Sequence, residues 1–192
     1  MKDTKLYIFL RPILTFLFKV IYNPKIINKS YITNGNLILA GNHTSILDPI
    51  LLISSTKRPI HFLAKKELFC GIKKIIFNHM GLIKVDRQAK NKEALTTAYN
   101  YLNDNKLIGI FPEGTTEKNK GLLEFKIGAV KMAKETDSKI IPFVITGSYK
   151  PFKNDLKIEF LKPIKVDENL EYANTNLRNI IKKKVEEYDA NI

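Results

Sequence analysis

Short apolar runs alternate with amphipathic stretches along most of the chain. The runs have the length of buried strands, whereas the stretches between them place their apolar residues on one face of a helix. Strands that alternate with helices in this way predict a single α/β domain, with a largely parallel or mixed sheet flanked by helices. Pro142 lies inside one expected strand and indicates an edge, a bulge or a strand start there, because proline cannot donate to a sheet ladder. The expected strands cover 37–40, 60–64, 81–87, 107–111, 139–145 and 156–160, and the expected helices 49–55, 65–78, 90–104, 122–135 and 170–188.

Residues 5–22 form the most apolar part of the chain, but Arg11 and Lys19 interrupt them. The run therefore lacks the ~20 uninterrupted apolar residues that cross a bilayer, and no signal-peptide cleavage site follows it. Arg11, Thr15 and Lys19 recur at every fourth position and make a narrow polar stripe on an otherwise apolar helix. Such an amphipathic helix is expected in a membrane interface, with its cationic groups toward the lipid headgroups, although a buried core helix gives the same pattern. The expected division is a membrane-interface helical segment over 1–22 and a separate domain over 23–192.

The chain is strongly basic, with 32 Lys and Arg residues against 19 Asp and Glu residues and a formal net charge of +13. This balance indicates an anionic partner, which can be a nucleic acid, a membrane surface or a phosphorylated substrate. No Arg-rich recognition helix, zinc-ligand spacing or aromatic-basic RNA-binding motif is present, so we expect no nucleic acid partner. Cys70 is the single cysteine, which excludes an intramolecular disulfide, and we interpret it as a bystander rather than a nucleophile.

One short segment places an imidazole and a carboxylate five positions apart, directly after the apolar run 37–40. Asp48 and Pro49 look like a helix start, with Asp48 as the cap, so His43 falls in the loop between strand and helix. In such a loop the Asp48 carboxylate can bond one imidazole nitrogen and leave the other to take a proton, as in a general base with its orienting partner. The alternative is a capping aspartate beside an incidental histidine. His61 and His79 carry lysines at the same offset instead of a carboxylate.

Other polar residues also follow expected strands. Ligands of parallel α/β sheets collect outside the carboxyl ends of the strands. His43, the pair Asp86 and Arg87, and Glu113 all stand at such ends, so we expect them to share one rim of the sheet. The turn 112–116 is either a simple chain reversal or a turn whose backbone N–H groups face an anion.

The order of these segments resembles that of the glycerolipid acyltransferase family, which includes the lysophosphatidic acid acyltransferases. The resemblance covers about residues 36–148, and each motif is weak alone, whereas four in the family's order are strong. The four motifs are Asn42-His43-x4-Asp48, Gly81-Leu82-Ile83-Lys84-Val85-Asp86-Arg87, Phe111-Pro112-Glu113-Gly114-Thr115 and Ile141-Pro142-Phe143-Val144. The stretch Phe125-Lys126-x-Gly128-Ala129 also matches the segment that the family usually has between the last two motifs.

The resemblance implies the glycerolipid acyltransferase fold over 23–192 and transfer of a fatty acyl group from a thioester to a glycerolipid hydroxyl. The donor would be acyl-CoA or acyl carrier protein, and the acceptor lysophosphatidic acid, which would give phosphatidic acid. By the family pattern His43 is the general base and Asp48 its partner, and neither a metal, a cofactor nor a covalent acyl-enzyme is required. The alternatives are a different lysolipid or glycerol 3-phosphate as acceptor, or a non-catalytic basic peripheral membrane protein. The expected location is the cytoplasmic face of the cell membrane, as a peripheral or monotopic protein on anionic lipid.

The third motif departs from the family pattern, because Thr116 stands where an arginine is usual. Arginine grips a phosphate with two charge-assisted hydrogen bonds, whereas a threonine hydroxyl offers one neutral bond. Another cation must therefore contact the acceptor phosphate, and we expect Arg87 in the first place and Lys126 in the second. The full set of expected acceptor-binding residues is Arg87, Glu113, Gly114, Thr115, Thr116 and Lys126.

Overall fold

The structure is a computed structural model, and it describes residues 5–68, 71, 79–86, 92–116 and 121–190. Within these residues the strands are β1 (Lys25–Ile27), β2 (Leu37–Gly41), β3 (Ile60–Lys65), β4 (Ile83–Val85), β5 (Leu107–Ile110), β6 (Lys139–Thr146) and β7 (Lys157–Phe160). The α-helices are α1 (Lys5–Tyr22), α2 (Asp48–Ser55), α4 (Lys92–Asn103), α5 (Gly128–Glu135) and α6 (Leu170–Asp189), and the short 3-10 helices are η1 (Lys29–Tyr31) and η2 (Lys66–Leu68).

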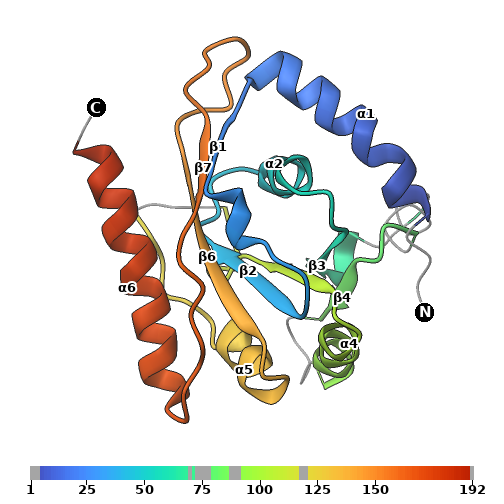
Figure 1. Cartoon of the computed structure of the whole chain (residues 1–192), viewed down its shortest axis with the longest axis vertical. Coiled ribbons are helices and arrows are strands. Elements are labelled where there is room, and N and C mark those ends of the chain that lie inside the picture. The colour runs from blue at the N-terminus through green and yellow to red at the C-terminus, as the bar shows by residue number, and fades with distance from the viewer. Residues whose placement is uncertain (1–4, 69–70, 72–78, 87–91, 117–120, 191–192) are drawn as a thin grey trace.

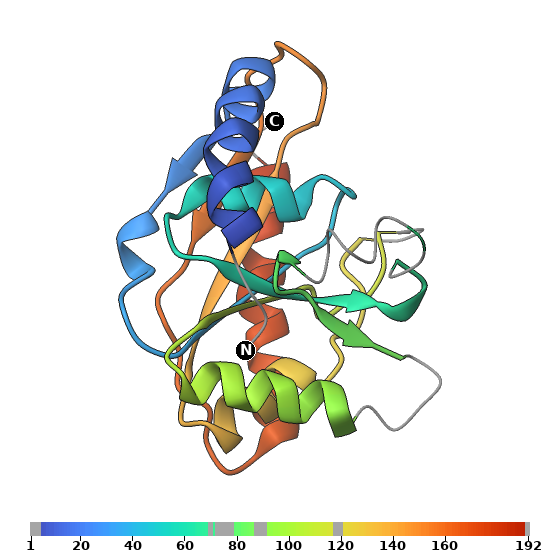
Figure 2. The same ribbon diagram turned by 90° about the vertical axis from the view of Figure 1, so that its right-hand side faces the viewer.

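The described strands form one sheet in the order β1-β7-β6-β2-β5-β3-β4. All pairings are parallel except that of β6 with β7, so the sheet is mixed, and the predicted α/β class is confirmed. Helices α1 and α2 cover one face, and α4, α5 and α6 cover the other (Figures 1 and 2).

Strand β2 lies in the middle of the sheet and is buried on both faces. Its alternate residues point to opposite sides: Ile38 and Ala40 pack in the core under α4, α5 and α6, whereas Leu37 and Leu39 pack in the core under α1 and α2. A strand buried in this way reads as a continuous apolar run, which is why 37–40 was recognisable in the sequence. The loop that carries His43 therefore begins at the carboxyl end of a strand that is held in place on both faces.

Three sequence expectations need correction. The expected helix 122–135 begins only at Gly128, because the backbone groups before it bond other partners: Glu113 accepts the Leu123 N–H, and the Lys126 N–H donates to the Pro112 carbonyl. The expected helix 65–78 is a 3-10 turn at its start, and most of the rest lies outside the described residues. The short edge strand β1, which pairs with β7, was not predicted from the sequence.

The expectation that Pro142 marks an edge or a strand start is also wrong, because β6 lies between β7 and β2. The antiparallel pairing with β7 begins at Phe143, and a separate bridge joins Ile140 to Ile164. Pro142 sits between these two pairings, where its carbonyl still accepts the Leu161 N–H. The proline therefore occupies a local interruption of the ladder, close to the bulge that was one of the expectations.

Helix α1 has one face against the domain and one face open. Tyr7 and Phe18 are buried on the inner face, and Arg11 Nε donates to the Thr56 carbonyl at 2.7 Å. Arg11 thus bonds the end of α2, whereas the polar stripe had predicted that it points toward lipid headgroups. The outer face is apolar, with six side chains that are 46–67% exposed: Ile8, Phe9, Ile13, Phe16, Leu17 and Val20. No helix in the described part of the chain is apolar over enough residues to span a bilayer.

Candidate active site

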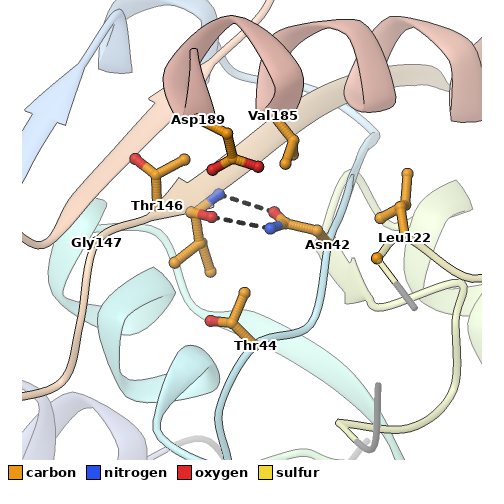
Figure 3. Close-up of a pocket in the computed structure, with 9 residues that line it drawn as sticks. Asn42, Thr44, Leu122, Thr146, Gly147, Val185 and Asp189 are labelled. Carbon is orange, nitrogen blue, oxygen red and sulfur yellow. Dashed lines mark hydrogen bonds between the residues drawn. The ribbon is translucent and has the colours of Figure 1, made fainter. Parts of the chain in front are cut away.

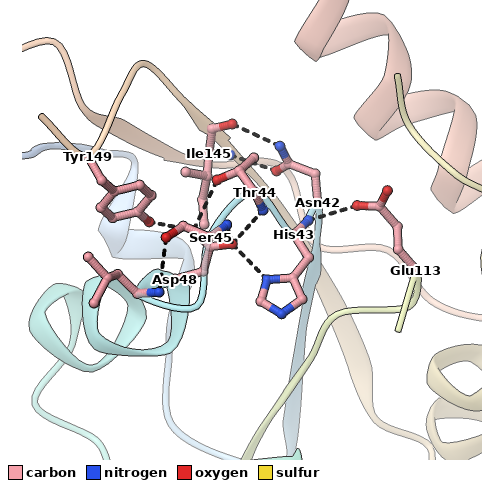
Figure 4. A network of polar contacts seen from close by, with 9 residues as sticks. Asn42, His43, Thr44, Ser45, Asp48, Glu113, Ile145 and Tyr149 are labelled. Atoms are coloured by element: carbon pink, nitrogen blue, oxygen red, sulfur yellow. Dashed lines mark hydrogen bonds and ion pairs between the residues drawn. The ribbon is translucent and has the colours of Figure 1, made fainter. Parts of the chain in front are cut away.

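The loop that leaves β2 is fixed first by Gly41 and Asn42. A Cβ atom on Gly41 would lie 2.4 Å from the Phe143 carbonyl oxygen, so only glycine allows β2 and β6 to approach at this point. Asn42 is buried and bonds the Ile145 backbone twice: its Nδ2 donates to the carbonyl and its Oδ1 accepts the N–H, both at 2.8 Å. The Asn42 side chain therefore extends the pairing of β2 with β6 by one step (Figures 3 and 4).

His43 and Asp48 are in contact as the sequence predicted. His43 Nδ1 lies 2.7 Å from Asp48 Oδ2, and the Thr44 and Ser45 backbone N–H groups donate to the same oxygen at 2.6 and 2.9 Å. The Thr44 hydroxyl and the Tyr149 hydroxyl donate to Oδ1 at 3.0 and 2.5 Å (Figure 4). A fully buried carboxylate is stable only when such donors replace its water, and this one selects the His43 tautomer with hydrogen on Nδ1.

Asp48 does not cap α2 in the expected way. The helix begins at Asp48 with Leu47 before it, and the Asp48 carboxylate accepts N–H groups that precede the helix. The side chain therefore shapes the loop of His43, residues 42–47, rather than the helix end. This arrangement leaves the His43 ring 17% exposed, with Nε2 as the nitrogen that can exchange a proton with a bound molecule.

Two residues after β5 also hold His43. The His43 ring stacks on the Phe111 ring, with centroids 4.1 Å apart and an interplanar angle of 14°. The His43 backbone N–H donates to Glu113 Oε1 at 2.8 Å, and Glu113 Oε2 accepts the Leu123 N–H at 2.9 Å. Glu113 is buried and joins the loop of His43 to the segment before α5, so the carboxyl ends of parallel strands β2 and β5 do share one rim.

Tyr149 was not found from the sequence. It lies in the loop between β6 and β7, beyond the last recognised motif, and no spacing links it to Asp48. Burial, and then the Asp48 charge, raise the pKa of Tyr149 far above its ordinary value, so its hydroxyl stays a donor over the physiological range. Phe111 was within a motif, but its contact with His43 also had no signal in the pattern.

The remaining expected residues are placed differently. Gly114 closes a turn by donating its N–H to the Phe111 carbonyl, and its φ of 71° suits glycine. Thr116 and Lys126 are exposed beside this turn. Arg87 and Cys70 lie outside the described residues. His61 is a buried core histidine whose Nδ1 bonds the Gly81 carbonyl.

A pocket of about 230 Å³ lies next to Asn42, between the ends of β2 and β6 and the last turns of α6 (Figure 3). Its lining mixes apolar and polar groups, and Thr44 joins the pocket to the loop of His43. Among the residues that the structure describes, no group of three or more His, Cys, Asp or Glu side chains could hold a metal ion. The residues that line the pocket are Asn42, Thr44, Gly121, Leu122, Ile145, Thr146, Gly147, Val185 and Asp189.

Comparison with known proteins gives a consistent picture. A family model described as Acyltransferase matches residues 23–146. The chain is 31% identical over 162 residues to the 1-acyl-sn-glycerol-3-phosphate acyltransferase of Borreliella burgdorferi. The aligned region covers 79% of this chain and 65% of that protein. It is 36% identical over 132 residues to the protein of the same name from Helicobacter pylori, and this aligned region covers 65% of this chain and 54% of that protein.

The crystal structure of the 1-acyl-sn-glycerophosphate (LPA) acyltransferase PlsC from Thermotoga maritima is similar, with a TM-score of 0.75. The match covers 99% of this chain and 84% of that chain at 20% identity, which supports the fold. The chain spans about half to two thirds of the length of the curated relatives that it matches.

Proposed function

The chain belongs to the Acyltransferase family, and on that premise we propose that it transfers a fatty acyl group from an acyl thioester to the free hydroxyl of lysophosphatidic acid, which gives phosphatidic acid. The observation that carries the proposal is the bond between His43 Nδ1 and the buried Asp48 carboxylate. It orients the imidazole and leaves Nε2 to act as the general base. The names of the relatives support lysophosphatidic acid as the acceptor.

The reaction needs one proton transfer in each direction. Nε2 of His43 takes the hydroxyl proton while the acceptor oxygen attacks the thioester carbonyl carbon. When the tetrahedral intermediate collapses, the C–S bond breaks, and the imidazolium returns the proton to the thiolate. Asp48 stabilises the imidazolium through Nδ1, and the face of the Phe111 ring offers a further favourable contact to that cation. General base catalysis of this kind contributes on the order of 10²–10⁴-fold.

The acceptor phosphate requires a cation, and we infer that Arg87 supplies it, with Lys126 as the second. Thr116 offers only one neutral hydroxyl where the family has an arginine, while Lys126 stands exposed after the same turn. Arg87→Ala should raise the KM for the acceptor about 30-fold and leave the KM for the donor nearly unchanged, because a hydrogen bond to a charged group is worth about 2 kcal/mol. Equal rates on a phosphate-free acceptor, together with an unchanged Arg87→Ala variant, would contradict this assignment.

An anionic membrane, on its cytoplasmic face, is the proposed partner of α1. The outer face of the helix exposes six large apolar side chains, and the whole chain carries a formal charge of +13. An apolar helix face adjoining a basic domain suits the interface of an anionic bilayer. The acceptor and the product would then stay in the lipid phase, next to the rim that holds His43.

The test is an acyl-transfer assay with the purified chain. Lysophosphatidic acid, glycerol 3-phosphate and lysophosphatidylglycerol are each offered with acyl-CoA and with acyl carrier protein as donor. Turnover on lysophosphatidic acid, lost in His43→Ala while circular dichroism shows that the variant is still folded, is the expected result. Turnover only on another acceptor would promote the alternative substrate, and no turnover on any pair would favour a non-catalytic membrane protein. Near-normal rates in His43→Ala would refute the mechanism.

A further inference from the structure

We propose that Tyr149 is a positioning residue, which holds the Asp48 carboxylate against His43 and connects this pair to helix α1. The inference rests on the proposed function, because it assumes that His43 acts as the base. It adds a residue from outside the recognised motifs, and it gives the inner face of α1 a part in the chemistry as well as in the packing.

The Tyr149 hydroxyl bonds the Asp48 carboxylate oxygen that does not contact His43. Asp48 Oδ2 faces His43, whereas Oδ1 accepts the Tyr149 hydroxyl at 2.5 Å. The other described donors to Asp48 come from residues 43–45, which belong to the same loop, but Tyr149 is 101 positions away. A bond to Oδ1 from another part of the fold fixes the rotation of the carboxylate and so the direction in which Oδ2 points.

The ring of Tyr149 is held by α1. It makes T-shaped contacts with Phe18, with centroids 6.2 Å apart and an angle of 67°, and with Tyr22, with centroids 5.8 Å apart and an angle of 78°. The backbone of the same loop is joined to the helix as well, since the Phe152 N–H donates to the Ile21 carbonyl at 2.8 Å. In Figures 1 and 2 the C-terminal end of α1 lies next to the loop between β6 and β7.

These contacts form a continuous path from α1 through Tyr149 to Asp48 and His43. A displacement of the C-terminal half of α1 would move the Tyr149 ring, and with it the hydrogen bond to Oδ1. The helix that we propose to dock on the membrane is therefore also the support of the catalytic carboxylate. Loosening its inner face should lower kcat even when no membrane surface is present.

The pH dependence gives a second readout. Among the described residues, two titratable groups contact the Asp48 carboxylate: the His43 imidazole from the same loop and the Tyr149 hydroxyl from the loop between β6 and β7. Tyr22 of α1 packs against the Tyr149 ring, and the Glu113 carboxylate accepts the His43 backbone N–H. With the Tyr149 hydroxyl removed, the Asp48 charge is less dispersed and attracts the imidazole proton more strongly. Because the base must be neutral to act, the acid limb of the pH–rate profile should then move to higher pH.

The experiment compares Tyr149→Phe with Tyr188→Phe in the full chain. Tyr188 also donates its hydroxyl to a carboxylate, Glu159, at 2.8 Å, and its ring contacts are with Lys157 and Lys184 rather than with the loop of His43. Rates are measured with a short-chain lysolipid that forms no micelles, so that membrane docking does not contribute. We expect Tyr149→Phe to lower kcat on the order of 10-fold, with both KM values within about twofold and the acid limb raised, and Tyr188→Phe to match the wild type.

A third variant tests the connection to α1. Phe18→Leu keeps the Tyr149 hydroxyl but loosens the packing of its ring, and it should lower kcat by a smaller factor in the same assay. If Tyr149→Phe fails to fold, Phe18→Leu tests the proposal instead. In Phe18→Leu the low-field NMR signal of the His43 Nδ1 proton should shift, together with the fall in kcat.

A Tyr149→Phe variant that behaves like Tyr188→Phe would overturn the proposal, as would one that raises only the acceptor KM, since Tyr149 would then contact substrate. An inactive His43→Ala beside an unaffected Tyr149→Phe refutes this inference and leaves the proposed function standing. An active His43→Ala refutes the proposed function itself.

Discussion

Replacing Glu113 by glutamine separates two roles that this residue can have. The family resemblance assigns Glu113 to the acceptor, whereas in the structure its two carboxylate oxygens accept the N–H groups of His43 and Leu123 at 2.8 and 2.9 Å. In Glu113→Gln one of these N–H groups meets the NH₂ of the amide instead of an oxygen. Glu113 is buried, so the variant loses a charge-assisted bond and leaves a donor without an acceptor.

The expected cost is about 3 kcal/mol in the free energy of unfolding, at the lower end of what the two losses together imply. For a domain of this size that cost lowers Tm by roughly 6–12 °C. Because the loss of either bond weakens the link between the loop of His43 and the segment before α5, kcat should fall along with Tm. Calorimetry and steady-state kinetics on the same preparation measure both quantities.

The control is Glu124→Gln in the same segment. Glu124 is 87% exposed and pairs with Arg178 at 2.9 Å, and exposed pairs contribute less than about 1 kcal/mol. Its Tm and kcat should therefore match the wild type. A Glu113→Gln variant with wild-type Tm and kcat, and with only the acceptor KM raised, would refute the positioning role and support direct contact with the acceptor.

Three further experiments test other parts of the structure. Asp48→Asn should lower kcat at least about 10²-fold, because an amide neither selects the same tautomer nor stabilises the imidazolium; a loss below tenfold in the acyl-transfer assay would contradict the pairing. The double change Phe9→Ser and Phe16→Ser should release the protein from anionic vesicles in co-sedimentation without lowering Tm, since both side chains are exposed; unchanged binding would exclude this face. Gly41→Ala should lower Tm strongly because its methyl group overlaps the backbone of β6, whereas Gly128→Ala, with its nearest neighbour 3.8 Å away, should leave Tm unchanged or raise it slightly; equal effects would contradict the close packing at β2.

The sequence predicted those features of the fold and the site that are determined by residues close together in the chain. The apolar run of β2 and the spacing of His43 and Asp48 both lie within a few residues, so pattern and spacing were enough to find them. The start of α5 was misplaced because Glu113 and Pro112 take backbone groups that a helix would use, and these competitors lie about ten residues or more away in sequence.

The orientation of α1 was missed for a similar reason. A polar stripe indicates that a helix has two faces, but not which of them meets the protein. Arg11 turns inward because the Thr56 carbonyl, 45 positions away in sequence, accepts a hydrogen bond from its Nε–H group. Tyr149 is the extreme case, since nothing near it in sequence hints at a carboxylate partner.

Two of the bonds that shape the loop of His43 reach across long stretches of chain, and this has a consequence for how the loop forms during synthesis. Asn42 bonds Ile145 over 103 positions, and Asp48 bonds Tyr149 over 101. A nascent chain that has emerged only through β5 already contains His43 and Asp48, but neither of these supports. Contacts between distant segments form slowly, because the intervening loop must close first. Recovery of activity on refolding should therefore follow the docking of β6 beside β2 rather than the earlier appearance of helices and strands.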